Sequence, residues 1–308
     1  MVRQQAMNRQ PAGNPLYDQA GGAKNRYQPA RSRSVTQPSP PGIDTSRPNI
    51  ARVYDYLLGG KDNFAADREL AGRLLSVDPH AGQWARDNRA FVCAAAARAA
   101  REGGIGQFLD LGAGLPTRPA VHEAVRDVIP DARVAYVDSD AVAVVHAQAL
   151  LARGAGLVTC RADLTEPDAV LGAPEVAGLI DLSRPVGIII GGVAHFLAGA
   201  VVREVTGAYL ARVPAGSWLM ISAGMVEDEA PGSAIQQLYT AATTFRHTRE
   251  EFATFLAGTD IVPPGVVEAK RWIAGIAAPP PTEGMYVQCG VGIKRLRSCR
   301  PASGVWDK

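Results

Sequence analysis

The feature that most constrains the fold of this chain is an alternation of short apolar runs with longer stretches of helical period. Beyond residue 103, apolar runs recur at 107–111, 134–137, 157–160, 186–190 and 217–221. Helical patterns separate them and are clearest at 141–151 and 201–213. This alternation predicts a parallel sheet with helices on both faces and right-handed crossovers. We therefore expect an α/β fold.

The segments on either side of this core also carry patterns. A helix is predicted over 84–101, and it should end at the glycines that follow at 103 and 104. After the last parallel strand, we predict helices near 233–245 and 248–257. An extended segment around 261–267 and a strand over 285–293 should complete the fold.

Residues 185–202 contain no Asp, Glu, Lys or Arg, and 18 residues is near the lower limit for a membrane-spanning helix. The stretch contains Pro185, four glycines and His195, which suit a buried strand followed by a turn. We therefore predict no membrane segment. The first ten residues lack the apolar core of a secretory signal, so the expected location is the cytoplasm.

The net charge is unevenly distributed. The whole chain of 308 residues carries +2, but residues 1–40 carry +5 and the remainder carries −3. Residues 1–42 are rich in Gln, Asn, Pro, Gly and Ser without any period, so we expect a disordered basic tail. A basic arm that contacts an acidic partner is the alternative. A mildly acidic folded part argues against a nucleic-acid partner.

The cysteines do not form a site in the sequence. No CxxC pair and no Cys/His cluster at metal-ligand spacing is present, so we predict no metal site. Scattered cysteines are typical of buried thiols in a reducing compartment. The four residues are Cys93, Cys160, Cys289 and Cys299.

The first predicted strand ends in a glycine turn, at the sheet edge where α/β folds bind ligands. Gly112 and Gly114 permit a tight turn and close approach of a nucleotide-like ligand. Asp110 puts a carboxylate where it would repel a diphosphate and attract an ammonium or sulfonium group. Thr117 stands where a dinucleotide fingerprint requires Gly or Ala, and Pro116 removes an N–H at the expected helix start. These features favour S-adenosyl-L-methionine over NAD.

Acidic residues also follow the next two predicted strands. Asp138 closes the second strand, 24 residues after Gly114, near the interval at which an acid accepts hydrogen bonds from ribose hydroxyls. Asp163 follows the third strand, where a short acid would meet the adenine amino group. Both have structural alternatives, because Asp is frequent in turns and at helix N-caps. We include the adjacent Ser139 and Leu164 in the expected cofactor site.

The fourth predicted strand leads into the loop Gly191–Phe196, at the edge where a substrate should lie. We expect Gly191 beside the cofactor, and His195 is a candidate general base. A hydrogen-bonded structural histidine is the alternative for His195. The loop has neither the Asp/Asn-Pro-Pro-Tyr sequence of exocyclic-amine DNA methyltransferases nor a Pro-Cys nucleophile, which favours a small-molecule acceptor.

The block 47–64, RPNIARVYDYLLGGKDNF, predicts a helix with a stop at two glycines. Pro48 suits its first turn and Ser46 is a candidate N-cap. Its apolar face should comprise Ile50, Tyr54, Leu57 and Leu58. Either this helix packs over the sheet edge, or it is a lid. In the second case, Tyr54 covers the cofactor and Lys61 pairs with its methionine carboxylate.

With these motifs, the chain resembles a family of S-adenosylmethionine-dependent methyltransferases from GC-rich bacteria. The block 47–64 is the most specific part, and the resemblance covers roughly residues 43–295. It implies a Rossmann-like class I methyltransferase fold, with a seven-stranded, mostly parallel sheet, helices on both faces and an N-terminal helical lid. It also implies that the cofactor binds at Asp110, Gly112, Gly114, Asp138 and Asp163.

The expected organisation is a tail (1–42), a helical cap (43–103), a methyltransferase domain (104–297) and a C-terminal tail (298–308). The segment KRWIA at 270–274 departs from the Trp-Arg-Pro that the family often has. Two other functions stay open: a non-catalytic S-adenosylmethionine-binding regulatory protein and an NAD-dependent oxidoreductase.

Overall fold

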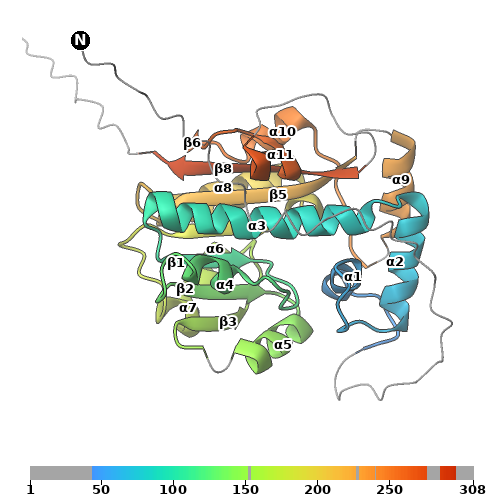
Figure 1. The fold of residues 1–308 in the computed structure, drawn as a ribbon, viewed down its shortest axis with the longest axis horizontal. Coiled ribbons are helices and arrows are strands. Elements are labelled where there is room, and N and C mark those ends of the chain that lie inside the picture. The colour runs from blue at the N-terminus through green and yellow to red at the C-terminus, as the bar shows by residue number, and fades with distance from the viewer. Residues whose placement is uncertain (1–43, 152–153, 227–228, 240, 276–284, 296–308) are drawn as a thin grey trace, which may run out of the picture. The chain divides into compact units, whose positions relative to one another are not determined.

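A computed structural model describes residues 44–151, 154–226, 229–239, 241–275 and 285–295, and in them five parallel strands form the centre of one sheet (Figure 1). These are β1 (Gln107–Leu111), β2 (Arg133–Asp138), β3 (Leu157–Arg161), β4 (Gly187–Gly191) and β5 (Trp218–Val226). β8 (Met285–Lys294) is antiparallel to β5, β6 (Thr259–Ile261) and β7 (Val267–Glu268).

The strand order is β3-β2-β1-β4-β5-β8-β6, and the two-residue β7 pairs with β8 beside this path. Seven strands therefore form the continuous sheet. The predicted mostly parallel α/β architecture is confirmed. The predicted tails, 1–42 and 298–308, and Cys299 fall outside the described residues.

Helices cover both faces of the sheet. The long helix α3 crosses one face, and α8 lies on the other (Figure 1). The helices before the sheet are α1 (Ile50–Leu57), α2 (Ala65–Val77) and α3 (Ala81–Gly103). Those between strands are α4 (Val121–Arg126), α5 (Ala141–Leu151), α6 (Pro167–Gly172), α7 (Pro174–Ala177), the 3₁₀ turn η1 (Ala194–Phe196) and α8 (Gly199–Arg212). The later ones are α9 (Glu229–Leu238), α10 (Arg249–Thr254) and α11 (Ala269–Ala274).

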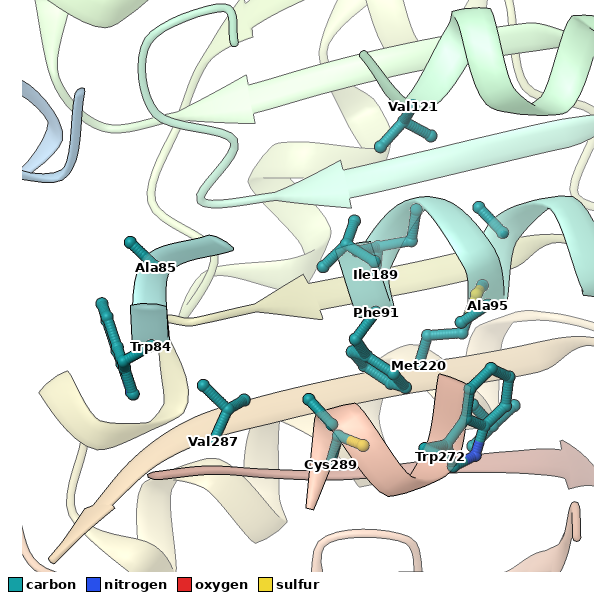
Figure 2. Packing of buried hydrophobic residues seen from close by; sticks show 14 of the residues in the cluster. Trp84, Ala85, Phe91, Ala95, Val121, Ile189, Met220, Trp272, Val287 and Cys289 are labelled. Atoms are coloured by element: carbon teal, nitrogen blue, oxygen red, sulfur yellow. The ribbon is translucent and has the colours of Figure 1, made fainter. Parts of the chain in front are cut away.

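Alternate residues of each central strand pack into two separate cores. In β4, Ile189 joins the core under α3, whereas Ile188 and Ile190 join the core under α8. Figure 2 shows the α3 side, where Phe91 and Met220 pack beside Ile189. Strands buried on both faces explain the continuous apolar runs in the sequence.

The uncharged stretch 185–202 is β4, the turn η1 and the start of α8, as predicted. No helix among the described residues has the length and apolar character needed to cross a bilayer. The buried, unbridged state predicted for the cysteines is confirmed for Cys93, Cys160 and Cys289.

The second half of the helix predicted over 233–245 is wrong, because α9 ends at Leu238. The backbone turns away there, and the Phe245 N–H donates to the His195 carbonyl at 2.7 Å. The extended segment predicted over 261–267 is interrupted between β6 and β7 by Pro263 and Pro264, which have no N–H for a sheet ladder.

Candidate active site

A cavity of about 450 Å³ lies at the carboxyl ends of the first four strands. Strand order reverses here, because β2 lies on one side of β1 and β4 on the other. Open α/β sheets bind ligands at this switch point. The volume is within the range of small-molecule sites, about 300 to 1,000 Å³. The cavity is also lined by α1, α3 and the segment after α9.

Most of the residues predicted to bind the cofactor line this one cavity. They are Tyr54, Asp110, Gly112, Gly114, Asp138, Ser139, Asp163, Leu164 and Gly191. Three strand ends that are distant in sequence therefore converge as the topology predicts.

Lys61 is the exception. Its side chain is exposed and does not line the cavity. The loop after α1 folds back onto Asp55, whose carboxylate accepts from the Asp62 N–H and the Asn63 amide, both at 2.9 Å. The Gly60 N–H also donates to the Asp55 carbonyl. This closure keeps Lys61 away from the site, contrary to the prediction.

The glycine turn has the backbone that the sequence predicts. Gly112 and Gly114 have φ of +72° and +65°, in the left-handed region that favours glycine. A Cβ at Gly112 would lie 2.6 Å from Cγ2 of Val193, so the turn also packs closely against the loop after β4. No helix starts at Pro116, because α4 begins only at Val121.

Asp110 is a buried carboxylate that lines the cavity, and it is only 4% exposed. Among the described residues, no group makes a hydrogen bond or an ion pair with its carboxylate. Burial raises its pKa to about 6; the nearby Arg89 charge opposes this increase, and Asp138 adds to it. Such a group is expected to bind a cationic partner, because an ionised carboxylate is costly to bury alone.

Arg89 of α3 also lines the cavity and was missed as a site residue by the sequence analysis. Its Nε donates to the Pro119 carbonyl at 2.7 Å, which holds the side chain beside the glycine turn. The planar guanidinium has five N–H donors and suits a carboxylate. Residues 86–89 of α3 are Arg-Asp-Asn-Arg, so no local pattern distinguishes Arg89 from its polar neighbours.

The acids after β2 and β3 are oriented by the backbone. The two oxygens of Asp138 accept from the N–H groups of Gly114 (2.7 Å) and Asp140 (2.9 Å). One oxygen of Asp163 accepts from the N–H and the hydroxyl of Thr165, each at 2.8 Å. Each carboxylate retains lone pairs that can accept from a ligand.

Helix α1 lies against the cavity, with Ile50, Ala51 and Tyr54 in its lining. The predicted cap is wrong: Ser46 bonds to Asp44, and the N-cap is Asn49, whose Oδ1 accepts from the Arg52 N–H at 3.1 Å. The helix therefore starts after Pro48, with Pro48 outside its first turn.

The predicted apolar face of α1 is divided between two environments. Leu57 is buried in the core under α3, as is Val53, which was not predicted, whereas Ile50 and Tyr54 face the cavity. The Asn49 amide donates to the carboxylate of Asp140, which links α1 to the loop after β2.

The model of a family described as S-adenosyl methyltransferase matches residues 36–295. The chain belongs to this family. The methyltransferase therefore uses S-adenosylmethionine, and its class I fold agrees with the strand order above. Family membership also sets aside the NAD-dependent oxidoreductase.

Two crystal structures are similar to this methyltransferase. A protein of Thermobifida fusca YX, provisionally assigned as a methyltransferase, is 37% identical, with a TM-score of 0.76 over 83% of this chain and 98% of that one. A duf574 family protein of Streptomyces avermitilis MA-4680 is 32% identical, with a TM-score of 0.74 over 82% and 99% of the two chains. No protein with a curated description matches.

His195, the predicted candidate base, is buried beside this cavity of the methyltransferase and does not line it. Its Nδ1 accepts from the Gly224 N–H at 3.2 Å. Burial, with a smaller effect of His247, lowers its pKa to about 3. This geometry fits a hydrogen-bonded structural histidine better than it fits a general base that acts next to the cofactor.

The end of the cavity beside β4 is aromatic. Tyr54, Trp84, Phe196 and Tyr239 line it, and the Tyr54 and Trp84 rings meet edge to face at 5.9 Å. The Tyr54 hydroxyl donates to the Ala85 carbonyl and accepts from the Asn88 amide. These bonds hold the Tyr54 ring in place.

Proposed function

We propose that this methyltransferase binds S-adenosylmethionine across the ends of β1, β2 and β3 and transfers its methyl group to a small molecule at the aromatic end of the cavity. Asp110 carries the proposal. Its buried carboxylate has no partner in the described part of the chain and lies in a cavity that the glycine turn also lines. Such a carboxylate fits a ligand that carries an ammonium group and a sulfonium.

The lining residues supply a partner for each part of the cofactor. Asp110 would hold the α-ammonium, and Arg89 would take the carboxylate role predicted for Lys61. Asp138 would accept from the ribose hydroxyls, and Asp163 from the adenine amino group. The second contact of the adenine would be the apolar side chain of Leu164. Ser139, Gly112, Gly114 and Gly191 would complete the site.

The bound cofactor supplies an electrophilic methyl group on sulfur. The chain must therefore orient the acceptor and exclude water. The four aromatic residues at that end of the cavity would do both. A cavity of this size beside α1, in a chain whose residues 41–308 have net negative charge, supports a small-molecule acceptor over nucleic acid.

Calorimetric titration tests cofactor binding. We expect S-adenosylmethionine and S-adenosylhomocysteine to bind and NAD not to bind; binding of NAD alone would overturn the proposal. The acceptor class is tested with methyl-labelled cofactor and a whole-cell extract separated by size. Label should enter the small-molecule fraction, and label confined to protein or nucleic acid would contradict the small-molecule acceptor.

A further inference from the structure

A chain of hydrogen bonds at the cavity joins α1, α3, β5 and the loop after β4. The Tyr54 hydroxyl is 3.0 Å from the Ala85 carbonyl and 2.9 Å from Nδ2 of Asn88. At the other end of the amide, Oδ1 of Asn88 is 2.6 Å from Oγ of Ser222, which accepts from the Gly192 N–H at 2.9 Å. Asn88 and Ser222 are both buried. We call this chain of bonds the Tyr54 network.

The backbone carbonyl at one end of the Tyr54 network fixes the position of its protons. A carbonyl has no proton, so the Tyr54 hydroxyl donates its only proton to Ala85. Its oxygen therefore accepts from the amide nitrogen of Asn88, and the amide oxygen accepts the proton of Ser222. Burial raises the pKa of Tyr54 to about 12, so the hydroxyl keeps its proton at neutral pH.

The Asn88 amide is also held by packing. Gly192 has φ of +71°, and a Cβ there would lie 2.7 Å from Nδ2 of Asn88. The loop after β4 therefore packs directly against the amide nitrogen. Because the amide also has a hydrogen-bond partner at each of its two polar atoms, its orientation is fixed.

The direction of these bonds determines what Tyr54 offers to a ligand. Tyr54 and Asn88 both line the cavity, whereas Ala85, to which the Tyr54 proton points, does not. A phenol oxygen has two lone pairs, and in the described part of the chain only one of them accepts a hydrogen bond. At the aromatic end of the cavity, Tyr54 therefore acts as a hydrogen-bond acceptor and not as a donor.

We infer that the methyl acceptor carries an N–H or O–H group that donates to the Tyr54 oxygen, which makes Tyr54 a specificity-determining residue. The inference rests on the proposed function, which places the acceptor at this end of the cavity. An ether, a nitrile or a carboxylate would bring a lone pair against this oxygen and would lose hydrogen bonds to water without replacement. An amine, an amide or a hydroxyl group would be paired.

The test uses the full chain saturated with S-adenosylhomocysteine and three small aromatic probes, each titrated by calorimetry at neutral pH. The probes are 4-methylaniline, which donates, 4-methylbenzonitrile, which only accepts, and 4-fluorotoluene, which does neither well. We expect 4-methylaniline to bind about three- to tenfold more tightly than either of the others, although 4-fluorotoluene is more apolar. Equal or tighter binding of either other probe, or binding of none of the three, would overturn the inference.

Tyr54→Phe removes the oxygen and keeps the ring. The preference for 4-methylaniline over 4-fluorotoluene should disappear, because the amide N–H that Asn88 then leaves unpaired is a donor and the aniline nitrogen accepts poorly. The affinity for 4-methylbenzonitrile should increase for the same reason. A loss of stability alone would not reverse the order of the probes.

Tyr209→Phe is the matched control. The Tyr209 hydroxyl also donates to a backbone carbonyl, that of Leu164, at 3.1 Å, but Tyr209 does not line the cavity. This variant should keep the wild-type preference. An unchanged preference in Tyr54→Phe, or an equal loss in Tyr209→Phe, would contradict the role of Tyr54.

The titration with S-adenosylhomocysteine that precedes each probe separates the two possible failures. If S-adenosylhomocysteine does not bind, the proposed function fails. If it binds and the donor-bearing probe is not preferred, the inference about the acceptor fails alone.

Discussion

Asp110 shows how a single residue links stability to ligand binding. Its carboxylate is buried and has no partner among the residues that the structure describes, and burial raises its pKa from 3.8 to about 6. A raised pKa in the folded state means that the folded protein holds this proton more tightly than the unfolded chain. The stabilising contribution is therefore complete below pH 3.8 and is lost as the pH rises to about 6.

Asp110→Asn should remove this pH dependence. The wild type should lose up to about 3 kcal/mol of unfolding free energy between pH 4 and pH 7 that the variant does not lose. The difference between variant and wild type should therefore shift by this amount in favour of the variant. Chemical denaturation of the ligand-free protein at several pH values measures it. A constant difference between the two proteins across this range would show that Asp110 ionises as an exposed acid does.

Gly112 is constrained both by its backbone and by its contact with Val193. Gly112→Ala should lower the free energy of unfolding by more than the roughly 1 to 2 kcal/mol that left-handed backbone costs a residue with a side chain. It should also weaken S-adenosylhomocysteine binding. Gly258→Ala is the control, because Gly258 has φ of +83° and open space around it. Equal destabilisation by both substitutions would rule out the packing contribution.

Among the secondary-structure elements, α3 brings a cationic side chain, Arg89, to the cavity. The sequence predicted that this cation would be Lys61, in the loop after α1. The 23-residue helix brings Trp84, Asn88 and Arg89 to the cavity, while its remaining length packs over the sheet. In contrast, α1 contributes mainly Tyr54 and the link from Asn49 to Asp140. The buried ion pair of Arg52 with Asp67, at 2.8 Å, fixes α1 to α2.

Two substitutions test whether α3 or the loop after α1 supplies the cation that pairs with the methionine carboxylate of the cofactor: Arg89→Gln and Lys61→Gln. Arg89→Gln should weaken S-adenosylmethionine binding by about 10- to 100-fold, the effect of one lost charge-assisted hydrogen bond. Lys61→Gln should leave the affinity unchanged, because the side chain is exposed outside the cavity. Titration of both variants measures this, and the reverse order of effects would restore the original prediction for Lys61.

The sequence predicts well those elements whose structure depends on residues that are neighbours in the chain. Strand ends follow from continuous apolar runs, and the turn at Gly112 follows from glycine itself. The path of the chain after α9 includes a bond between Phe245 and His195, and the position of Lys61 depends on the closure of its loop onto Asp55. Neither contact can be predicted from a local pattern, and for the same reason Arg89 was missed as a site residue.

On the scale of the whole molecule, the near-neutral charge conceals two different regions. Residues 1–40 carry +5 and residues 41–308 carry −3, and the described residues that line the cavity all fall between 48 and 241. A chain without residues 1–40 should therefore bind S-adenosylmethionine as tightly as the full chain does. Calorimetry on both chains checks this, and a loss above about tenfold on deletion would show that the basic segment contributes to the site.

The placement of the cofactor's ammonium on Asp110 is tested most directly by the affinity for S-adenosylhomocysteine between pH 5 and pH 8. Wild-type affinity should rise as the pH increases through about 6, because only the ionised carboxylate pairs with the ammonium. Asp110→Asn should bind about 10- to 100-fold more weakly at pH 8 and show little change over this range. Equal affinity of the two proteins at pH 8 would contradict this placement of the cofactor.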